Sequence, residues 1–230
     1  RWFHPTPGTI SPGEFIPVAE ETRMVMDITA FVLRQATAQL ARWQQMHPAF
    51  AALQMHINVS GLDLANDNLA TQVQHALSTT RLRSNHVVLE ITESILMESV
   101  GGGFAMAERL RSLGVELAID DFGTGFSSLS NLARLPISSI KIDGSFVRDL
   151  QPGTANEAII KSVLVLAQSI NKLVIAEGIE TVGQRDHLVA LGCCFGQGYL
   201  MAKPMMPEAV IQMLGKVCIS PPLPVQEVLA

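Results

Sequence analysis

Short apolar runs alternate with amphipathic segments along most of the chain. Apolar runs with the strand pattern occur at residues 55–60, 86–92, 115–121, 139–143, 173–177 and 195–200. Apolar residues recurring at three- and four-residue steps predict helices near residues 64–77, 104–113, 128–135, 156–170, 182–191 and 207–214. This repeated order of strand, helix and strand predicts a parallel sheet with helical crossovers.

The N-terminal part of the chain precedes this alternation and shows a helical pattern. The same periodicity predicts a long helix over residues 24–45. A shorter helix is expected after Ser11, because Ser11 and Glu14 have the spacing of a capping box and Pro12 falls at the first helical position. We expect Pro17 to limit this helix to a short piece.

Each predicted strand ends in a polar group that an apolar run does not favour. In chain order these groups are Asn58, Glu90, Asp120 with Asp121, Lys141, Glu177 and Gln197. In a closed barrel the carboxyl ends of all strands face one cup, whereas an open sheet gathers ligands at a single switch point. The pattern therefore predicts a TIM-type (β/α)8 barrel in a modified form, whose first strand lies partly or wholly upstream of Arg1.

The residue types at these strand ends favour a site for hard cations. Carboxylate and amide oxygens without histidine or thiolate suit Mg²⁺ or Mn²⁺. Adjacent acids such as Asp120 and Asp121 can serve two ions together, as in sites for in-line displacement at phosphorus. Lys141 would orient or deprotonate a water, or offset charge on a phosphoryl oxygen. The alternative is a buried ion-pair network without a metal, which does not explain why all these groups share one end of the strands.

Composition narrows the class of protein. With 230 residues, 48% hydrophobic and 16% charged, the chain is expected to fold around a sizeable core. The formal net charge of −5 disfavours a nucleic-acid partner, which needs a basic patch. Three cysteines cannot form a fully paired framework, so we expect a reduced, cytoplasmic location. No signal peptide or membrane span is visible, so no membrane contact is expected of this domain; anchoring of a longer parent protein stays open.

Several short strings occur in an order that is specific as a set. They are Arg1-Trp2, Asn58-Val59-Ser60, Glu90-Ile91-Thr92-Glu93-Ser94, Asp120-Asp121-Phe122-Gly123-Thr124-Gly125, Lys141-Ile142-Asp143, Ala176-Glu177-Gly178-Ile179-Glu180 and Gln197-Gly198-Tyr199-Leu200. With this set the chain resembles the EAL-domain cyclic di-GMP phosphodiesterases, from Arg1 to about Leu214. We expect residues 1–217 to form the EAL phosphodiesterase domain and residues 218–230 to form a Pro-rich C-terminal tail.

The resemblance implies a bacterial signalling enzyme that hydrolyses cyclic di-GMP to linear 5′-pGpG with two Mg²⁺ or Mn²⁺ ions per site. By position, it implies that Asn58, Glu90 and Asp120 hold the first ion. It implies that Asp120, Asp121 and Glu177 hold the second. Lys141 would assist the attacking water, Gln197 would position the water or the substrate, and Arg1 would contact a substrate phosphate. Pro204, with Met201, follows the Gln197 strand end and is a candidate for the guanine pocket.

The resemblance also implies partners. Glu93 would brace the loop from Asp121 to Ser128, which in the family links the metal site to the dimer interface, so we expect a homodimer through this region. Phe126 stands where the family usually has tyrosine, a change expected to alter dimer coupling rather than chemistry. Regulatory or GGDEF-type domains are expected upstream. The name-giving Glu-Ala-Leu-x-Arg motif would place its glutamate, a first-metal ligand in the family, four residues before Arg1 and outside the sequence.

Other interpretations remain open from the residues alone. A degenerate EAL domain would act as a cyclic di-GMP receptor without cleaving it, although such receptors typically lose several ligands. An enolase-type lyase or isomerase also carries strand-end acids and a lysine, but it needs a separate capping domain. His56 shares strand parity with Asn58 and is expected to face the barrel interior as a hydrogen-bonded histidine rather than as a ligand.

Overall fold

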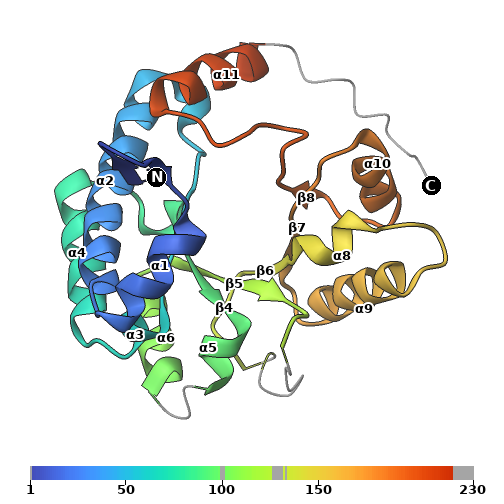
Figure 1. Cartoon of the computed structure of the whole chain (residues 1–230), viewed down its shortest axis with the longest axis horizontal. Helices are drawn as coiled ribbons and strands as arrows, with labels where there is room; N and C mark the ends of the chain where they lie inside the picture. The colour runs from blue at the N-terminus through green and yellow to red at the C-terminus, as the bar shows by residue number, and fades with distance from the viewer. Residues whose placement is uncertain (1, 99–101, 126–131, 133, 220–230) are drawn as a thin grey trace.

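The main sheet of the molecule has six parallel strands, each hydrogen-bonded to the next in chain order. The computed structural model describes residues 2–98, 102–125, 132 and 134–219. The strands are β3 (Met55–Asn58), β4 (Val87–Thr92), β5 (Glu116–Phe122), β6 (Ser139–Ile142), β7 (Leu173–Ala176) and β8 (Phe195–Gly196). Figure 1 shows this sheet curled around the middle of the molecule with helices outside it. The arrangement confirms the predicted modified TIM-type barrel; a strand upstream of Arg1 stays a prediction.

The observed strands begin within one residue of the expected positions. The clearest difference is β8, expected over residues 195–200 but ending at Gly196. Beyond it the chain turns, with the backbone amide of Met201 donating to the carbonyl of Gly198 at 3.1 Å. The expected strand therefore continues beyond Gly196 as a turn.

Helices connect the strands and cover the outside of the sheet. They are α2 (Val25–Met46), α3 (Gly61–Leu64), α4 (Asn68–Thr80), α5 (Glu93–Glu98), α6 (Gly102–Ser112), α8 (Gly144–Arg148), α9 (Ala155–Ser169), α10 (Val182–Ala190) and α11 (Pro207–Ile219), with 3₁₀ turns at Pro48–Phe50 and Ser84–His86. The single helix expected over residues 64–77 is two helices, because the Asn66 side chain accepts from the Asn68 amide at 3.0 Å and starts a new helix. The helix expected over residues 128–135 lies largely outside the described residues.

The N-terminal segment departs most from the sequence pattern. Strands β1 (Trp2–His4) and β2 (Gly8–Ile10) form an antiparallel hairpin that the sequence did not predict. Helix α1 (Pro12–Glu21) continues through Pro17, so the expected early stop is wrong. Pro17 lies on an exposed face with Gly13, whose carbonyl can bond to water in place of the missing N–H. Ser11 is the N-cap residue, but its side chain makes no capping hydrogen bond.

The strands carry two kinds of side chain on their two faces. Leu89 and Ile91 of β4 are completely buried and share one core with Val73 of α4 and Leu110 of α6. Glu90 lies between them in sequence and therefore points to the opposite face, the inside of the barrel. Burial of each large apolar side chain stabilises the fold by about 1.5–3 kcal/mol, which fixes the register and with it the direction of the polar groups.

Two expectations concern the C-terminal part and the membrane. Helix α11 runs to Ile219, so the expected boundary at residues 217 and 218 falls within it, and residues 220–230 lie outside the described residues.

Of the helices in the described ranges, none is both long enough and apolar enough to cross a bilayer.

Candidate active site

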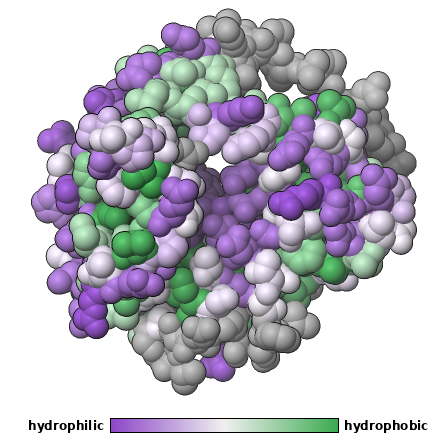
Figure 2. Space-filling view, in the orientation of Figure 1, coloured by the Kyte–Doolittle hydropathy of each residue, from purple (hydrophilic) through white to green (hydrophobic). Residues whose placement is uncertain are grey.

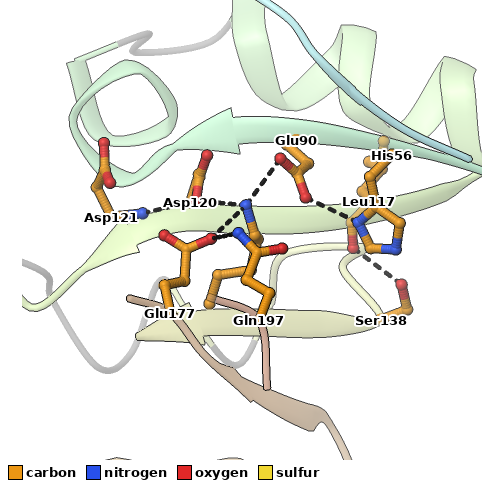
Figure 3. A network of polar contacts seen from close by, with 9 residues as sticks. His56, Glu90, Leu117, Asp120, Asp121, Ser138, Glu177 and Gln197 are labelled. Carbon is orange, nitrogen blue, oxygen red and sulfur yellow. Dashed lines mark hydrogen bonds and ion pairs between the residues drawn. The ribbon is translucent and has the colours of Figure 1, made fainter. Parts of the chain in front are cut away.

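The polar strand-end residues converge in one hollow of the molecule. Hydrophilic side chains surround the hollow at the centre of the face in Figure 2. Figure 3 shows that Glu90, Asp120, Asp121, Glu177 and Gln197 approach one another from neighbouring strands. The strands lie side by side in chain order, so residues more than 100 positions apart in the sequence meet here.

Lys141 is the electrostatic centre of this site. Its ammonium Nζ lies 2.8 Å from Glu90 Oε2, 2.9 Å from Asp120 Oδ1 and 2.7 Å from Glu177 Oε1. The lysine side chain is only 4% exposed, and it rises from the middle of β6 between the two halves of the sheet. Its three N–H donors are thus matched to three carboxylates from three different strand ends.

Each of these carboxylates also has a second donor. His56 Nδ1 lies 2.7 Å from Glu90 Oε1, and Gln197 Nε2 donates to Glu177 Oε1 at 2.5 Å. The backbone amide of Asp121 donates to Asp120 Oδ1 at 3.1 Å. The carboxylates are therefore held in fixed orientations, as a preformed binding site requires.

An irregularity in β5 brings two neighbouring acids to the same site. The register between β5 and β6 shifts between Ile119 and Phe122, so one extra residue is accommodated on β5. Asp121 lies in this stretch with φ of 53°, in the left-handed region. Because the backbone leaves the regular pleat here, Asp121 is not directed to the opposite face. One oxygen each from Asp120, Asp121 and Glu177 lies within 4.8 Å of the others.

Two acids of the cluster have raised pKa values. Burial, followed by the charges of Asp120 and Asp143, raises the pKa of Asp121. Burial also raises the pKa of Glu177 despite its hydrogen bond to Lys141.

The pKa of Glu90 is lowered and the pKa of Lys141 is raised, as expected for a stable ion pair. For Glu90, burial alone would raise the pKa, but the His56 hydrogen bond and the Lys141 charge outweigh it and lower the pKa. For Lys141, burial would lower the pKa, but Glu90 and the other carboxylates outweigh it and raise the pKa. Both groups are therefore ionised at neutral pH.

The donor set fits divalent cations. Glu90, Asp120, Asp121 and Glu177 carry four negative charges when ionised, and Lys141 offsets one of them. The uncompensated charge and the clustered oxygens suit hard ions such as Mg²⁺ or Mn²⁺. Asn58 adds an amide oxygen donor on β3, where it is the register partner of Glu90.

Glu93 lies beside this site and contacts the loop that follows β5. It is 1% exposed, and its Oε2 accepts from the backbone amide of Gly123 at 2.8 Å. Gly123 has φ of +100°, and a Cβ there would lie 2.8 Å from the Phe146 ring, so only glycine fits. The other oxygen, Oε1, has no hydrogen-bond partner among the described residues. Most of the loop from Gly125 to Ser128 lies outside the described residues.

A cavity of about 660 Å³ adjoins the acidic cluster. Glu177 and Gln197 of the cluster line this cavity, and Tyr199, Lys203 and Pro204 are among its other lining residues. Pro204 therefore lines this cavity and Met201 does not, and a substrate contact of Pro204 stays a prediction. Arg1, the other candidate substrate contact, lies outside the described residues.

Comparisons with known proteins decide the family. Residues 1–204 match the EAL domain family. The chain belongs to the EAL domain family. This assignment confirms the resemblance drawn from the ordered strings and removes the enolase-type alternative.

Individual relatives of this EAL domain are named for cyclic di-GMP chemistry. The chain is 38% identical over 211 residues to the bifunctional diguanylate cyclase/cyclic di-GMP phosphodiesterase MucR of Pseudomonas aeruginosa, covering 92% of this chain and 30% of MucR. It is 40% identical over 208 residues to the cyclic di-GMP phosphodiesterase PA2567 of the same species, covering 90% of this chain and 35% of that protein. The chain thus spans about a third of the length of these relatives.

A solved EAL structure has the same fold. The MucR phosphodiesterase in complex with cyclic di-GMP superposes with a TM-score of 0.87 at 38% identity, covering 91% of this chain and 84% of that one. Ligand binding in that structure is a property of MucR.

The structure of this EAL domain adds residues that the sequence analysis did not single out for the site. Tyr199 and Lys203 line the cavity, with the Lys203 ammonium 5.8 Å from the Tyr199 ring centroid. His56 was expected to be hydrogen-bonded, and it is, but its partner Glu90 was not anticipated. The available signal was strand parity, since His56 and Asn58 share a face of β3 and Asn58 pairs with Glu90.

Proposed function

We propose that this EAL domain hydrolyses cyclic di-GMP to linear 5′-pGpG with two Mg²⁺ or Mn²⁺ ions. The observation that carries the proposal is the buried Lys141 ammonium, held at 2.7–2.9 Å from carboxylates at three strand ends. The carboxylates can bind divalent ions, and the lysine adds a positive charge that can face the anionic diester. The relatives named as cyclic di-GMP phosphodiesterases support this choice of substrate.

The proposed ligand sets follow the strand order. Asn58, Glu90 and Asp120 would hold the first ion, and Asp120, Asp121 and Glu177 would hold the second. The clustered oxygens of the second set support this division. Such ions supply charge neutralisation and activation of water when they are bound.

The remaining roles belong to residues that reach the reacting atoms. Hydrolysis adds one water across a P–O3′ bond: the hydroxyl joins phosphorus, and the 3′ oxygen leaves with a proton. Lys141 would orient the attacking water and offset charge on the phosphoryl oxygen, and Gln197 would position the water or the substrate. Arg1 would contact a substrate phosphate, and Pro204 would line the cavity that takes a guanine.

The experiment is a product assay with a matched substitution. The chain would be prepared with Glu-Ala-Leu-x ahead of Arg1, incubated with cyclic di-GMP and Mn²⁺, and analysed for pGpG by chromatography. We expect pGpG from the unaltered chain, none with EDTA, and none from Asp120→Asn. Asp67→Asn, an exposed acid at the start of α4, is the control and should retain activity. Binding of cyclic di-GMP without any pGpG would overturn hydrolysis and favour a receptor.

The wider setting is proposed on the same basis. We infer a bacterial second-messenger role in which residues 1–217 work as a homodimer through the region from Asp121 to Ser128. Regulatory or GGDEF-type domains would lie in the same polypeptide, as the name of MucR supports. The cytoplasmic location stays a prediction. Sedimentation of the chain at micromolar concentration tests the dimer directly.

A further inference from the structure

His56 contributes a histidine to a site otherwise built from acids, amides and one lysine. Its side chain is 35% exposed, and its Nδ1 lies 2.7 Å from Oε1 of Glu90, whose side chain is 6% exposed. In Figure 3 the imidazole lies beside Glu90, on the side away from Glu177. The nearly buried carboxylate therefore has the histidine on one side and the lysine on the other.

The hydrogen bond has a defined direction. An ionised carboxylate can only accept, so His56 Nδ1 must carry the proton. Glu90 then accepts from His56 through Oε1 and from Lys141 through Oε2 at 2.8 Å. Because each oxygen has two lone pairs, an oxygen that accepts from His56 can still bind an ion.

Strand geometry explains why His56 reaches Glu90. In the parallel pairing of β3 and β4, His56 is the register partner of Val88, and Asn58 is the register partner of Glu90. His56 and Asn58 are two residues apart and share a face, so His56 lies one step below Asn58. His56 therefore reaches Glu90 diagonally across the two strands, from the position two residues before Asn58.

Each of the three carboxylates that Lys141 contacts has one further hydrogen-bond donor. Asp120 has the backbone amide of Asp121, Glu177 has the amide of Gln197, and Glu90 has His56 as its second donor. Without His56, Lys141 would be the remaining side-chain donor to Glu90 in the described part of the chain. The carboxylate could then rotate toward the lysine and away from Asn58.

We propose that His56 is a positioning residue that aims the Glu90 carboxylate at the first ion, together with Asn58 and Asp120. This inference rests on the proposed function, since it concerns an ion that the function requires. The ion held by Asp120, Asp121 and Glu177 does not involve Glu90. Loss of His56 should therefore weaken one of two ions and leave the other unchanged.

Two amide substitutions of His56 test whether the position of the donor matters or only the polarity of the side chain. The side-chain amide nitrogen of asparagine reaches about as far as Nδ1 of histidine, whereas that of glutamine reaches about as far as Nε2. His56→Asn should therefore retain the donor to Glu90, and His56→Gln and His56→Leu should lose it. His187→Leu is the matched control, because His187 also bonds a glutamate, Glu157, at 3.0 Å, outside the acidic cluster.

The experiment measures Mn²⁺ binding by titration calorimetry and Mn²⁺ paramagnetic resonance, on the chain with Glu-Ala-Leu-x ahead of Arg1. We expect two ions for the unaltered chain and for His187→Leu. For His56→Gln and His56→Leu we expect one ion weakened about 10- to 100-fold, with recovery in His56→Asn. The turnover number should follow the occupancy of the weaker ion, and KM should change less.

The outcomes separate this inference from the proposed function. Two ions bound equally by the unaltered chain, His56→Gln and His56→Leu would overturn the positioning role and leave hydrolysis intact. Equal weakening of both ions would also overturn it, since that result indicates a general structural defect. Failure of the unaltered chain to bind Mn²⁺ would overturn the metal-dependent function and the positioning role with it.

Discussion

Two glutamates in this molecule have the same kinds of partner but lie in different surroundings. Glu90 contacts His56 and Lys141 at 2.7 and 2.8 Å inside the barrel. Glu157, in the first turn of α9, contacts His187 and Lys161 at 3.0 and 3.1 Å on the outside. Its second oxygen accepts from the backbone amide of Gly153 at 2.8 Å. We call Glu157, His187 and Lys161 the outer cluster. The inner cluster consists of His56, Glu90, Asp120, Asp121, Lys141 and Glu177.

The two clusters differ in their charge balance. In the outer cluster, the Gly153 amide, His187 and Lys161 lower the pKa of Glu157 to about 2, so its charge is well compensated. In the inner cluster, Lys141 must serve several carboxylates, and the pKa values of Asp121 and Glu177 are raised. Residue types alone do not distinguish a binding site from a structural contact; unsatisfied buried charge does.

The largest expected contrast comes from making the same substitution in both clusters. Glu90→Gln should reduce cyclic di-GMP turnover at least about 100-fold, because it removes a charge proposed to hold an ion. Glu157→Gln should leave turnover near that of the unaltered chain. Chromatographic measurement of pGpG formation checks both variants. Similar activity in the two variants would contradict a functional difference between the clusters.

The next contrast is between the two lysines. Lys141→Met should lower the free energy of unfolding of the metal-free chain by about 3–5 kcal/mol, because it leaves buried carboxylates without their shared partner. Lys161→Met removes a half-exposed side chain and should change stability little. Urea unfolding monitored by circular dichroism measures both.

Lys141→Met also tests the role of the lysine in the reaction. It should lower the turnover number while Mn²⁺ still binds, because the carboxylate oxygens remain. A loss of Mn²⁺ affinity as steep as in Asp120→Asn would contradict the proposed role of Lys141 toward water.

Metal addition should stabilise the molecule through the inner cluster alone. At a Mn²⁺ concentration about 100 times its Kd, binding contributes about 2.7 kcal/mol, which for a domain of this size raises the Tm by about 5–10 °C. The rise should be smaller in Asp121→Asn, which removes a ligand of one of the two proposed ions, and unchanged in Glu157→Gln. Differential scanning fluorimetry with and without Mn²⁺ gives the comparison, and an equal rise in all three chains would point to binding elsewhere.

The smallest effect is the pH dependence of the outer cluster. The pKa of Glu157 falls from an ordinary value of 4.5 to about 2 on folding. Its contribution to stability is therefore present above about pH 4.5 and is lost as the pH falls toward 2. The difference in Tm between the unaltered chain and Glu157→Gln should shrink over this interval. A difference that stays constant to pH 2.5 would show that the contact does not depend on the charge of Glu157.

The barrel and the inner cluster were largely predictable because both follow from local patterns. Alternation placed the strands, and a polar residue at the end of each run identified Glu90, Lys141 and Glu177. Parallel strands in chain order then bring these residues to one edge whatever their separation in sequence. No contact had to be known in advance.

Other features depend on contacts that no local pattern encodes. The hairpin of β1 and β2 has strands of three residues, too short to show alternation. The continuation of α1 through Pro17 depends on solvent reaching an exposed turn. The pairing of Glu157 with His187 joins α9 to α10 across 30 residues. Each required the packed structure rather than the sequence.

The left-handed backbone of Asp121 limits which side chains can replace it. Aspartate and asparagine tolerate this conformation better than residues with longer or branched side chains. Asparagine would thus preserve the bend in β5 while deleting a charge, and glutamate would preserve the charge while straining the bend. Glutamate, which keeps the charge, is therefore the replacement that this position accommodates less readily.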